Sequence, residues 1–386
     1  METVRIGIIG IGGMGSNHAG NITAGRVPNT ELAAVCDLRP ERLAWAKDSF
    51  GDAVARFDSP DDFFDRAEVD AIVIATPHYD HPGLAIRGFD AGFHVMTEKP
   101  VGVYTKQVRE MNERAAKSDR VFGIMYNQRT NPLYQKLREM IREGELGELK
   151  RTNWIITSWY RSQSYYDSGG WRATWQGEGG GVLLNQDPHQ LDLWQWCCGM
   201  PSRLRAFCYF GKFHDIEVED DVTAFVEYPN GATGVFVTST GDAPGTNRLE
   251  VTGDRGKVVI ENGKLSFSRL RVGEREFNRT YRGGFGSPES WDCEVPIRGE
   301  ATDHVGILTN WIDAIQNGQP LIAPGEEGIH GLSISNAMHL STWADDWVDF
   351  PVDEERYLAE LKRRIDESDV SKDDGTGTMN VDGTFA

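Results

Sequence analysis

The first third of the chain alternates short, mostly apolar runs with segments of helical character. The apolar runs occupy residues 4–9, 31–36, 53–57, 69–75, 93–96 and 121–125. Helical segments fit between them, for example at residues 40–49 and 81–92. Strands buried on both faces of a parallel sheet have this composition, and helices connect them. Residues 1–125 are therefore predicted to form an α/β domain.

The pattern changes after residue 126. Residues 148–159 alternate apolar and polar positions, and shorter alternating runs follow between residues 203 and 267. Turn sequences such as Pro229-Asn230-Gly231 separate these runs, which predicts an antiparallel sheet. Helical patterns occupy residues 131–143, 303–316 and 326–347. The expected architecture is thus α/β plus α+β, with a second domain at 126–350 and a polar tail at 366–386.

A glycine motif follows the first apolar run. Gly10-Ile11-Gly12-Gly13-Met14-Gly15 fits G-x-G-x-x-G, and Asp37 ends the second predicted strand about 20 residues later. In such a unit Gly10 permits a tight turn, Gly12 lets the backbone approach a pyrophosphate, and Gly15 lets helix pack on strand. The start of the helix offers free amides to phosphates. This combination predicts a Rossmann dinucleotide-binding domain.

Asp37 bears on the choice of cofactor. Its carboxylate can accept hydrogen bonds from both ribose hydroxyls and would repel a 2′-phosphate, which favours NAD. Arg39 could pair with such a phosphate, so NADP stays open as the less favoured cofactor.

Several polar residues follow the other predicted strands. Ligands of open parallel sheets bind beyond the carboxyl ends of the strands, so these residues are expected to line the cofactor site. The set comprises Thr76, Pro77, His78, His81, Glu98, Lys99 and Asn127. This topology alone places Lys99 near the nicotinamide.

The glycine motif, Thr76-Pro77, His81, Glu98-Lys99-Pro100 and residues 179–192 resemble the Gfo/Idh/MocA oxidoreductases. The resemblance covers about residues 4–347 and implies a second domain with a large open, mostly antiparallel sheet. It also implies that late helices return to the first domain and that subunits pair through the sheet, as a homodimer or homotetramer. The lysine of such a Glu-Lys-Pro motif contacts cofactor and substrate, and its proline is often cis.

The segment 177–199, GEGGGVLLNQDPHQLDLWQWCCG, combines glycines, polar groups and large apolar residues. Asp187-Pro188 looks like a helix cap followed by a first-turn proline, which places His189 in the first turn. The helix dipole then lowers the pKa of His189 and keeps its imidazole neutral. Alternatively the helix starts near Gly181 and puts Asn185 and His189 on one face, with Pro188 straining it. Asp192 lies beside His189 in both cases.

The resemblance implies that His189 is the base for a substrate hydroxyl, aided by an aspartate four residues earlier and by Lys99. This chain has Asn185 in place of that aspartate. An amide cannot take a proton, so the orienting role is expected to pass to Asp187 or Asp192. The catalytic candidates are accordingly Lys99, Asn185 and His189.

The loop at 160–177 is rich in aromatic and arginine side chains, which suits the apolar face and polar rim of a sugar. The same aromatics could instead form a small core, and Arg129 could either reach the substrate or pair with an acid. The expected substrate contacts are Lys99, Arg129, Tyr160, Trp171, Arg172, Trp175, Asn185, Asp187 and His189.

Composition and charge limit the classes of molecule that the protein is expected to bind. The net charge of −19 disfavours nucleic acids and anionic membranes, and no apolar run is long enough to span a bilayer. The N-terminus lacks the pattern of a signal peptide, and the five cysteines show no metal-ligand spacing. We expect reduced thiols, a cytoplasmic protein and no metal.

The sequence therefore predicts an NAD-dependent oxidation of a secondary hydroxyl in a sugar, polyol or glycoside. His189 acts as the base, Lys99 stabilises the oxygen, and hydride passes to nicotinamide. One alternative keeps NAD tightly bound for transient oxidation during glycoside cleavage, elimination or epimerisation. Another is a dinucleotide-dependent regulator, which Lys99 and His189 argue against because a sensor needs neither.

Overall fold

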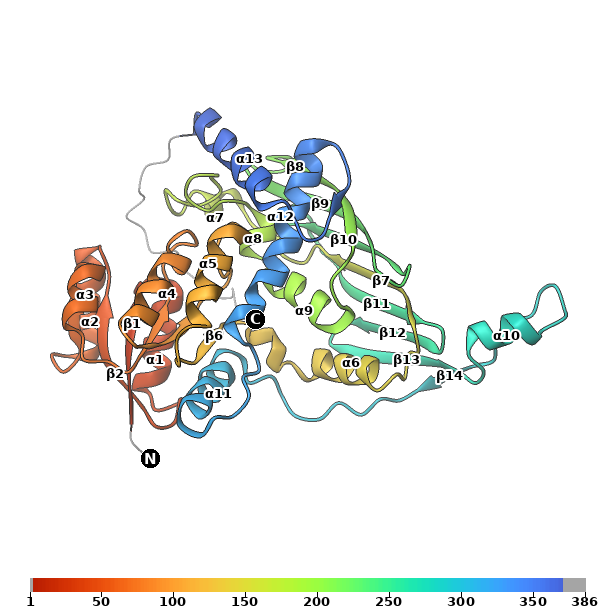
Figure 1. The fold of residues 1–386 in the computed structure, drawn as a ribbon, viewed down its shortest axis with the longest axis horizontal. Helices are drawn as coiled ribbons and strands as arrows, with labels where there is room; N and C mark the ends of the chain where they lie inside the picture. Colours follow the sequence, from red (N-terminus) through yellow and green to blue (C-terminus); the bar gives the residue numbers. More distant parts are fainter. Residues whose placement is uncertain (1–2, 371–386) are drawn as a thin grey trace.

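A computed structural model describes residues 3–370 and shows two domains around two sheets (Figure 1). The first domain holds a six-stranded parallel sheet in the order β3-β2-β1-β4-β5-β6, which is the Rossmann order. Its strands are β1 (Val4–Ile9), β2 (Thr30–Cys36), β3 (Ala55–Phe57), β4 (Ala71–Ile74), β5 (His94–Thr97) and β6 (Phe122–Ile124). Its helices are α1 (Gly13–Thr23), α2 (Pro40–Phe50), α3 (Pro60–Arg66), α4 (Asp80–Asp90) and α5 (Thr105–Ala115). The prediction of an α/β domain is confirmed.

Two glycines of the motif are required by close backbone contacts. Gly10 has φ +91°, and a Cβ there would lie 2.6 Å from the carbonyl oxygen of Ala75. A Cβ on Gly15 would lie 1.8 Å from the carbonyl oxygen of Gly10. Any larger residue at position 15 would push α1 off β1. The open space next to Gly12 and Gly13 instead faces the site where phosphates are expected.

The second domain holds a nine-stranded sheet in the order β14-β13-β12-β11-β7-β10-β9-β8-β15. Strands β7 and β10 pair in parallel, and the other neighbours are antiparallel. The strands are β7 (Leu149–Ile156), β8 (Arg203–Phe210), β9 (Glu219–Glu227), β10 (Thr233–Ser239), β11 (Asn247–Gly253), β12 (Gly256–Glu261), β13 (Lys264–Leu270), β14 (Ser290–Cys293) and β15 (Val348–Asp349). This confirms a large, mostly antiparallel second sheet.

The remaining helices lie between the sheets, against the first domain or beside the second sheet, except α10, which projects outward (Figure 1). They are η1 (Asn127–Thr130), α6 (Pro132–Arg142), α7 (Gln163–Tyr166), α8 (Val182–Asn185), α9 (Pro188–Cys198), α10 (Glu274–Thr280), α11 (Asp303–Asn317), η2 (Gly325–Glu327), α12 (Gly328–Ala344) and α13 (Glu354–Glu367). Figure 1 shows α12 running between the two domains. Asn336 on this helix accepts a hydrogen bond from the amide of Thr105 and donates one to the carbonyl of Val103. The late helices thus lie against the first domain.

Two features near the C-terminus differ from expectation. Helix α13 was not predicted, although its first turn carries the Asp353 cap and its salt bridges join it to α5. The predicted polar tail at 366–386 begins inside this helix, and its residues 371–386 lie outside the described part of the chain. Between residues 3 and 370, no helix has both the length and the apolar character needed to cross a membrane.

A buried ion cluster ties the segment that follows the last Rossmann strand to α9 and η2. Arg129 in η1 donates to both carboxylate oxygens of Asp192 on α9, at 2.8 and 2.6 Å, and also contacts Glu327. The side chains of Arg129 and Asp192 are essentially inaccessible to solvent. The geometry contradicts a substrate contact for Arg129 and an orienting role for Asp192 beside His189. Each charge instead satisfies the other within the protein.

Breaking this pair is expected to be costly. Asp192→Ala should lower the free energy of unfolding by about 3–5 kcal/mol, because it leaves the buried guanidinium with one partner fewer. Glu354→Ala, which removes the more exposed pair with Arg109, should cost only about 0–1 kcal/mol. Denaturant unfolding of both variants measures the difference. Equal losses would contradict the role given to the buried pair.

Candidate active site

The cofactor cradle forms where β1 and β2 end. Helix α1 begins at Gly13 with Gly12 as its cap, so its first amides have no partners inside the helix. The carboxylate of Asp37 accepts hydrogen bonds from the amides of Ile11 at 2.8 Å and Arg39 at 2.9 Å. It is therefore fixed beside the glycine loop. The Arg39 side chain lies 3.7 Å from Asp37 and is about half exposed.

Several buried polar atoms along the carboxyl edge of the first sheet lack a partner within the protein. They are Oγ1 of Thr76, Oγ1 of Thr97, Oδ1 of Asn127, Nδ1 of His18 and Nδ1 of His189. Buried polar groups are normally satisfied, so a set of this kind indicates a place for a polar ligand. A dinucleotide along this edge fits the glycine loop, Asp37 and these atoms together.

Glu98 forms a charged contact that the sequence did not reveal. Its Oε1 lies 2.7 Å from Nε2 of His18 on α1, and its Oε2 accepts from the amide of Lys99 at 3.1 Å. Burial raises the pKa of Glu98, but His18, His304 and Lys99 outweigh it and lower the pKa to about 2. Glu98 is thus a carboxylate at neutral pH. His18 was missed although it lies one helical turn beyond Met14, and His304 arrives from the distant helix α11.

Two histidines expected to contact the cofactor have other partners. His81 is fully buried, and its ring nitrogens lie 2.7 and 2.8 Å from the carbonyl oxygens of Pro100 and Thr76. Because neither nitrogen is left for a ligand, the prediction of a cofactor contact for His81 is contradicted. Nδ1 of His78 lies 3.2 Å from the carbonyl of Glu178, and its ring meets the edge of Trp171. His78 thereby ties the first domain to the loop at residues 160–178.

Lys99 reaches across to the second domain. Its peptide bond to Pro100 is cis, and its Nζ donates a 2.9 Å hydrogen bond to the backbone oxygen of Asn185. Burial lowers the pKa of Lys99, Glu98 opposes this, and Arg172 adds to the lowering. The ammonium group therefore stands at the junction of the two domains, beside the expected nicotinamide position.

The central segment forms two helices rather than one. Helix α8 ends at Asn185 and α9 begins at Pro188, with Asp187 in the cap position as predicted. The alternative of one helix from Gly181 through His189 is wrong, because the helix is interrupted between Asn185 and Pro188. The Asp187 side chain makes no capping hydrogen bond. Gln190 contacts Gln128 at 3.2 Å instead of completing a capping box.

His189 lies in the first turn of α9. Its ring and that of Tyr126 meet at an angle of 70°, with 6.3 Å between the ring centroids. Burial and the nearby charge of Lys99 lower the pKa of His189 to about 3, although Glu98 opposes the shift. The imidazole is therefore neutral at pH 7, as a general base must be.

Asp187 forms no hydrogen bond with His189 in the described chain. Its side chain is fully buried, and burial raises its pKa well above the ordinary value, with Thr238 of β10 and Trp159 opposing only in part. Asp187 therefore belongs to the side of the segment that packs on the second sheet. Both oxygens of its carboxylate are also among the buried polar atoms without a hydrogen-bond partner in the described chain, so a substrate contact for Asp187 stays a prediction, as does its orienting role for His189.

Asn185 has contacts at both ends of its amide. Its Nδ2 donates to Oε1 of Glu178, and its Oδ1 accepts from the Tyr165 hydroxyl at 3.2 Å. Arg172 in turn donates to the Tyr165 hydroxyl at 2.8 Å and stacks on Trp171. Glu178 and Tyr165 were missed as site residues. The one signal in the sequence for Glu178 was its position directly before three consecutive glycines.

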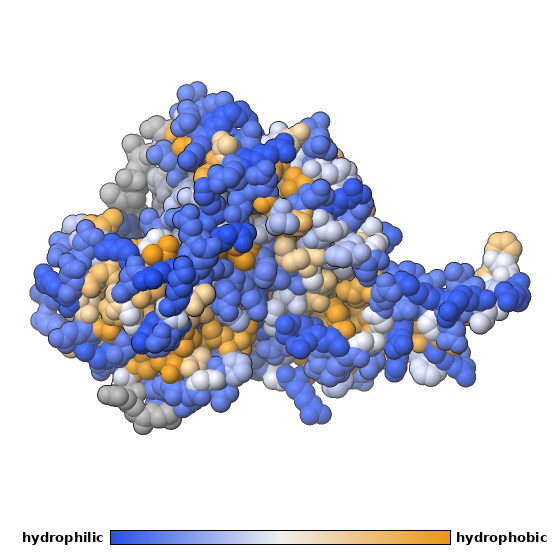
Figure 2. Space-filling model, in the orientation of Figure 1, coloured by the Kyte–Doolittle hydropathy of each residue, from blue (hydrophilic) through white to orange (hydrophobic). Residues whose placement is uncertain are grey.

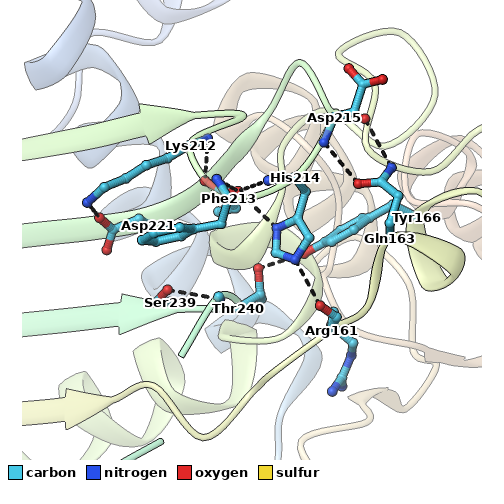
Figure 3. A network of polar contacts seen from close by, with 12 residues as sticks. Arg161, Gln163, Tyr166, Lys212, Phe213, His214, Asp215, Asp221, Ser239 and Thr240 are labelled. Atoms are coloured by element: carbon cyan, nitrogen blue, oxygen red, sulfur yellow. Dashed lines mark hydrogen bonds and ion pairs between the residues drawn. The ribbon is translucent and has the colours of Figure 1, made fainter. Parts of the chain in front are cut away.

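The loop at residues 160–177 is fastened to the second sheet by a polar network (Figure 3). Nδ1 of His214 lies 2.9 Å from Asp220, and Nε2 lies 2.8 Å from the carbonyl of Arg161. The Tyr166 hydroxyl contacts Thr240 at 2.7 Å. These contacts hold the start of the loop over the ends of β9 and β10.

The loop aromatics have different environments. Trp171 is partly exposed beside His78 and Arg172, which suits a substrate contact, and Tyr160 is 52% exposed. Trp175 is buried and packs on Phe210, His339 and Trp343. The prediction that Trp175 binds substrate is therefore contradicted, and the alternative of a small aromatic core holds for this residue.

Neither the cleft nor the metal-ligating side chains of the described chain indicate a second site for the proposed chemistry. A cleft of about 640 Å³ lies between α6, α9 and η2, but its lining includes none of Lys99, Asn185 and His189. Within residues 3–370, no group of three His, Cys, Asp or Glu side chains is placed to hold a metal ion.

Comparisons with known proteins give results for both domains. Residues 4–126 match an oxidoreductase family with an NAD-binding Rossmann fold, and residues 134–259 match the GFO/IDH/MocA C-terminal domain. The chain is 24% identical to myo-inositol 2-dehydrogenase of Thermotoga maritima, over 86% of this chain and 95% of that protein. It is 28% identical to D-glucoside 3-dehydrogenase of Escherichia coli, over 59% of this chain and 68% of that protein.

A solved structure shares the whole architecture. The WlbA dehydrogenase of Bordetella pertussis, in complex with NADH and UDP-GlcNAcA, superimposes with a TM-score of 0.78 at 25% identity. The match covers 91% of this chain and all of the other. Both domains of one family are thus present in order, and the chain belongs to the GFO/IDH/MocA family of NAD-binding oxidoreductases.

Proposed function

We propose that the protein oxidises a secondary hydroxyl of a small sugar, polyol or glycoside with NAD. The observation that carries this proposal is the convergence of Lys99 and a neutral His189 from two domains at the carboxyl edge of the Rossmann sheet. The names of the relatives, an inositol dehydrogenase and a glucoside dehydrogenase, support a polyhydroxylated substrate.

The residues divide the work of the reaction. A bound nicotinamide supplies a hydride acceptor. The His189 imidazole accepts the hydroxyl proton, and the Lys99 ammonium donates a hydrogen bond to the same oxygen and stabilises its developing charge. The alcohol thereby loses a proton and a hydride and becomes a carbonyl group. Trp171 and Arg172 offer an aromatic face and a polar edge to the substrate ring.

We also propose a homo-oligomer. The outer face of the second sheet exposes Phe207, Tyr209 and Phe225, and apolar side chains on a sheet face favour contact with another surface. The segment around α10 projects from the body of the molecule (Figure 1), and its tip is apolar on an otherwise mostly hydrophilic surface (Figure 2). Phe285 in this segment is fully exposed. A second copy of the chain would cover both features.

The catalytic assignment can be tested with His189→Gln and Lys99→Met. Each should reduce kcat by about 10²–10⁴-fold in an NADH-formation assay over polyols, aldoses and glycosides, because each removes a group that acts on the reacting oxygen. NAD binding, followed by quenching of protein fluorescence, should change little in His189→Gln. Full turnover by either variant would end the assignment.

The pH profile gives an independent prediction for His189. Since its pKa is lowered to about 3, the imidazole stays unprotonated as pH falls from 8 to about 5. The value of kcat/KM should therefore show no inflection near pH 6.5, where an ordinary histidine base would become protonated. An inflection there that vanishes in His189→Gln would contradict the assigned pKa.

Cofactor preference should depend on Asp37. Wild-type protein should prefer NAD to NADP in kcat/KM, and Asp37→Ser should reduce that preference by about tenfold or more, because the ribose contact and the repulsion of a 2′-phosphate are both lost. Arg39→Ser serves as the neighbouring control and should not reduce the use of NAD. A wild-type preference for NADP would overturn this assignment.

The oligomer prediction is checked by light scattering at micromolar concentration. Wild-type protein should have at least twice the mass of one chain. A double variant, Phe207→Asp with Phe285→Asp, should shift the equilibrium toward the monomer, because it places charges on both proposed contact surfaces. A monomeric wild-type protein would refute the proposal.

A further inference from the structure

We propose that Glu178 supplies the negative charge that an aspartate at position 185 would carry, and that it positions Lys99 through Asn185. In this chain the carboxylate is not at position 185 but on Glu178, which is hydrogen-bonded to the residue at that position. Glu178 is thus a positioning residue, and its assignment deepens the proposed function and rests on it.

The first support is the way in which Glu178 is held. Its side chain is buried, and Oε2 accepts a 2.6 Å hydrogen bond from the amide of Ala173. Oε1 accepts from Nδ2 of Asn185. Gly179, which follows, has φ +83°, and a Cβ there would lie 2.2 Å from Val103. A glycine is therefore needed for the chain to turn here with Glu178 pointing inward.

The second support is the orientation of the Asn185 amide. Its oxygen accepts from the hydroxyl of Tyr165 at 3.2 Å and from Nε2 of Gln186 at 3.3 Å. Its nitrogen faces the Glu178 carboxylate. An aspartate at 185 would set two carboxylates in contact within a buried site, which is costly unless one is protonated. Glu178 and Asn185 therefore form a matched pair, with one charge between them.

The third support is the route from this pair to Lys99. The backbone oxygen of Asn185 accepts the 2.9 Å hydrogen bond from Nζ, so fixing the Asn185 residue fixes the acceptor of the ammonium group. Burial lowers the pKa of Lys99, and the charges of Glu98 and, more weakly, Glu178 oppose this. Burial raises the pKa of Glu178 itself, while Arg172 and the hydrogen bonds from Ala173 and Asn185 favour its charged form. The fixed acceptor and the negative charges together keep Lys99 protonated and in place.

Three variants separate this role from a merely structural one: Glu178→Gln, Asn185→Asp, and the double variant that carries both changes. The double variant keeps one carboxylate and one amide but exchanges their positions. Glu217→Gln is the matched control, because Glu217 accepts a hydrogen bond from the amide of Trp175 in the same loop and, within residues 3–370, forms no hydrogen bond with Asn185.

The first readout needs no substrate. Reductive methylation of Lys99 over a pH series, quantified by peptide mass spectrometry, follows the protonation of its amine. In Glu178→Gln the labelling midpoint should fall by roughly one pH unit, since a nearby negative charge is lost. The double variant should return it most of the way to the wild-type value, and Glu217→Gln should leave it unchanged.

The second readout is stability and turnover. Asn185→Asp should unfold at a lower temperature than wild type, and the added Glu178→Gln change should restore the midpoint. With any substrate that the wild type oxidises, Glu178→Gln should lower kcat by about 10- to 100-fold with little change in KM. The double variant should recover at least a tenth of the wild-type kcat.

Several results would overturn the inference. An unchanged Lys99 profile in Glu178→Gln would show that the charge does not act on Lys99. A double variant as impaired as the worse single variant would show that the pair is not interchangeable. If the wild type oxidises no alcohol, the proposed oxidation fails, while Lys99 labelling still decides whether Glu178 acts on Lys99.

Discussion

The buried ion pair between Arg129 and Asp192 fixes the place where the chain enters the second domain. It ties η1, which follows the last Rossmann strand, to α9, the helix that carries His189. A charge pair buried this completely tolerates little displacement, because each partner alone would face a large desolvation penalty. The position of the proposed base relative to the cofactor edge therefore depends on an interaction that takes no part in the chemistry.

The proposed active site lies where the two domains meet. Lys99 reaches from the first domain to the Asn185 backbone in the second, and His78 reaches to the Glu178 carbonyl. The two domains thus meet through hydrogen bonds beside the groups that we propose to react. The pKa of Glu98 and that of His189 are both lowered by their surroundings in this junction, which leaves Glu98 ionised and His189 neutral.

The sequence predicted those parts that depend on local rules. The glycine motif, the spacing to Asp37, the buried strands and the break before Pro188 follow from backbone sterics and hydrophobic periodicity, and the structure agrees with them. The motif around Lys99 also placed that residue correctly at the edge of the sheet.

The errors have a common physical origin. Sequence shows that a polar side chain lies near the site but not whether its partner is a ligand or another residue distant in the chain. Arg129 pairs with Asp192, His81 binds two backbone oxygens, and Trp175 packs into an aromatic core. Glu178 was missed for the same reason, because its proposed positioning role depends on hydrogen bonds with Ala173 and Asn185 that form only in the folded loop.

Isotope transfer tests the central claim most directly. The enzyme, in excess over a perdeuterated polyol or glycoside, would be mixed with NAD in a single turnover, and the cofactor would be analysed by mass spectrometry. The account predicts that deuterium appears on the nicotinamide ring as the substrate is consumed. Consumption of the substrate with no deuterium in the cofactor at any time would contradict hydride transfer at this site.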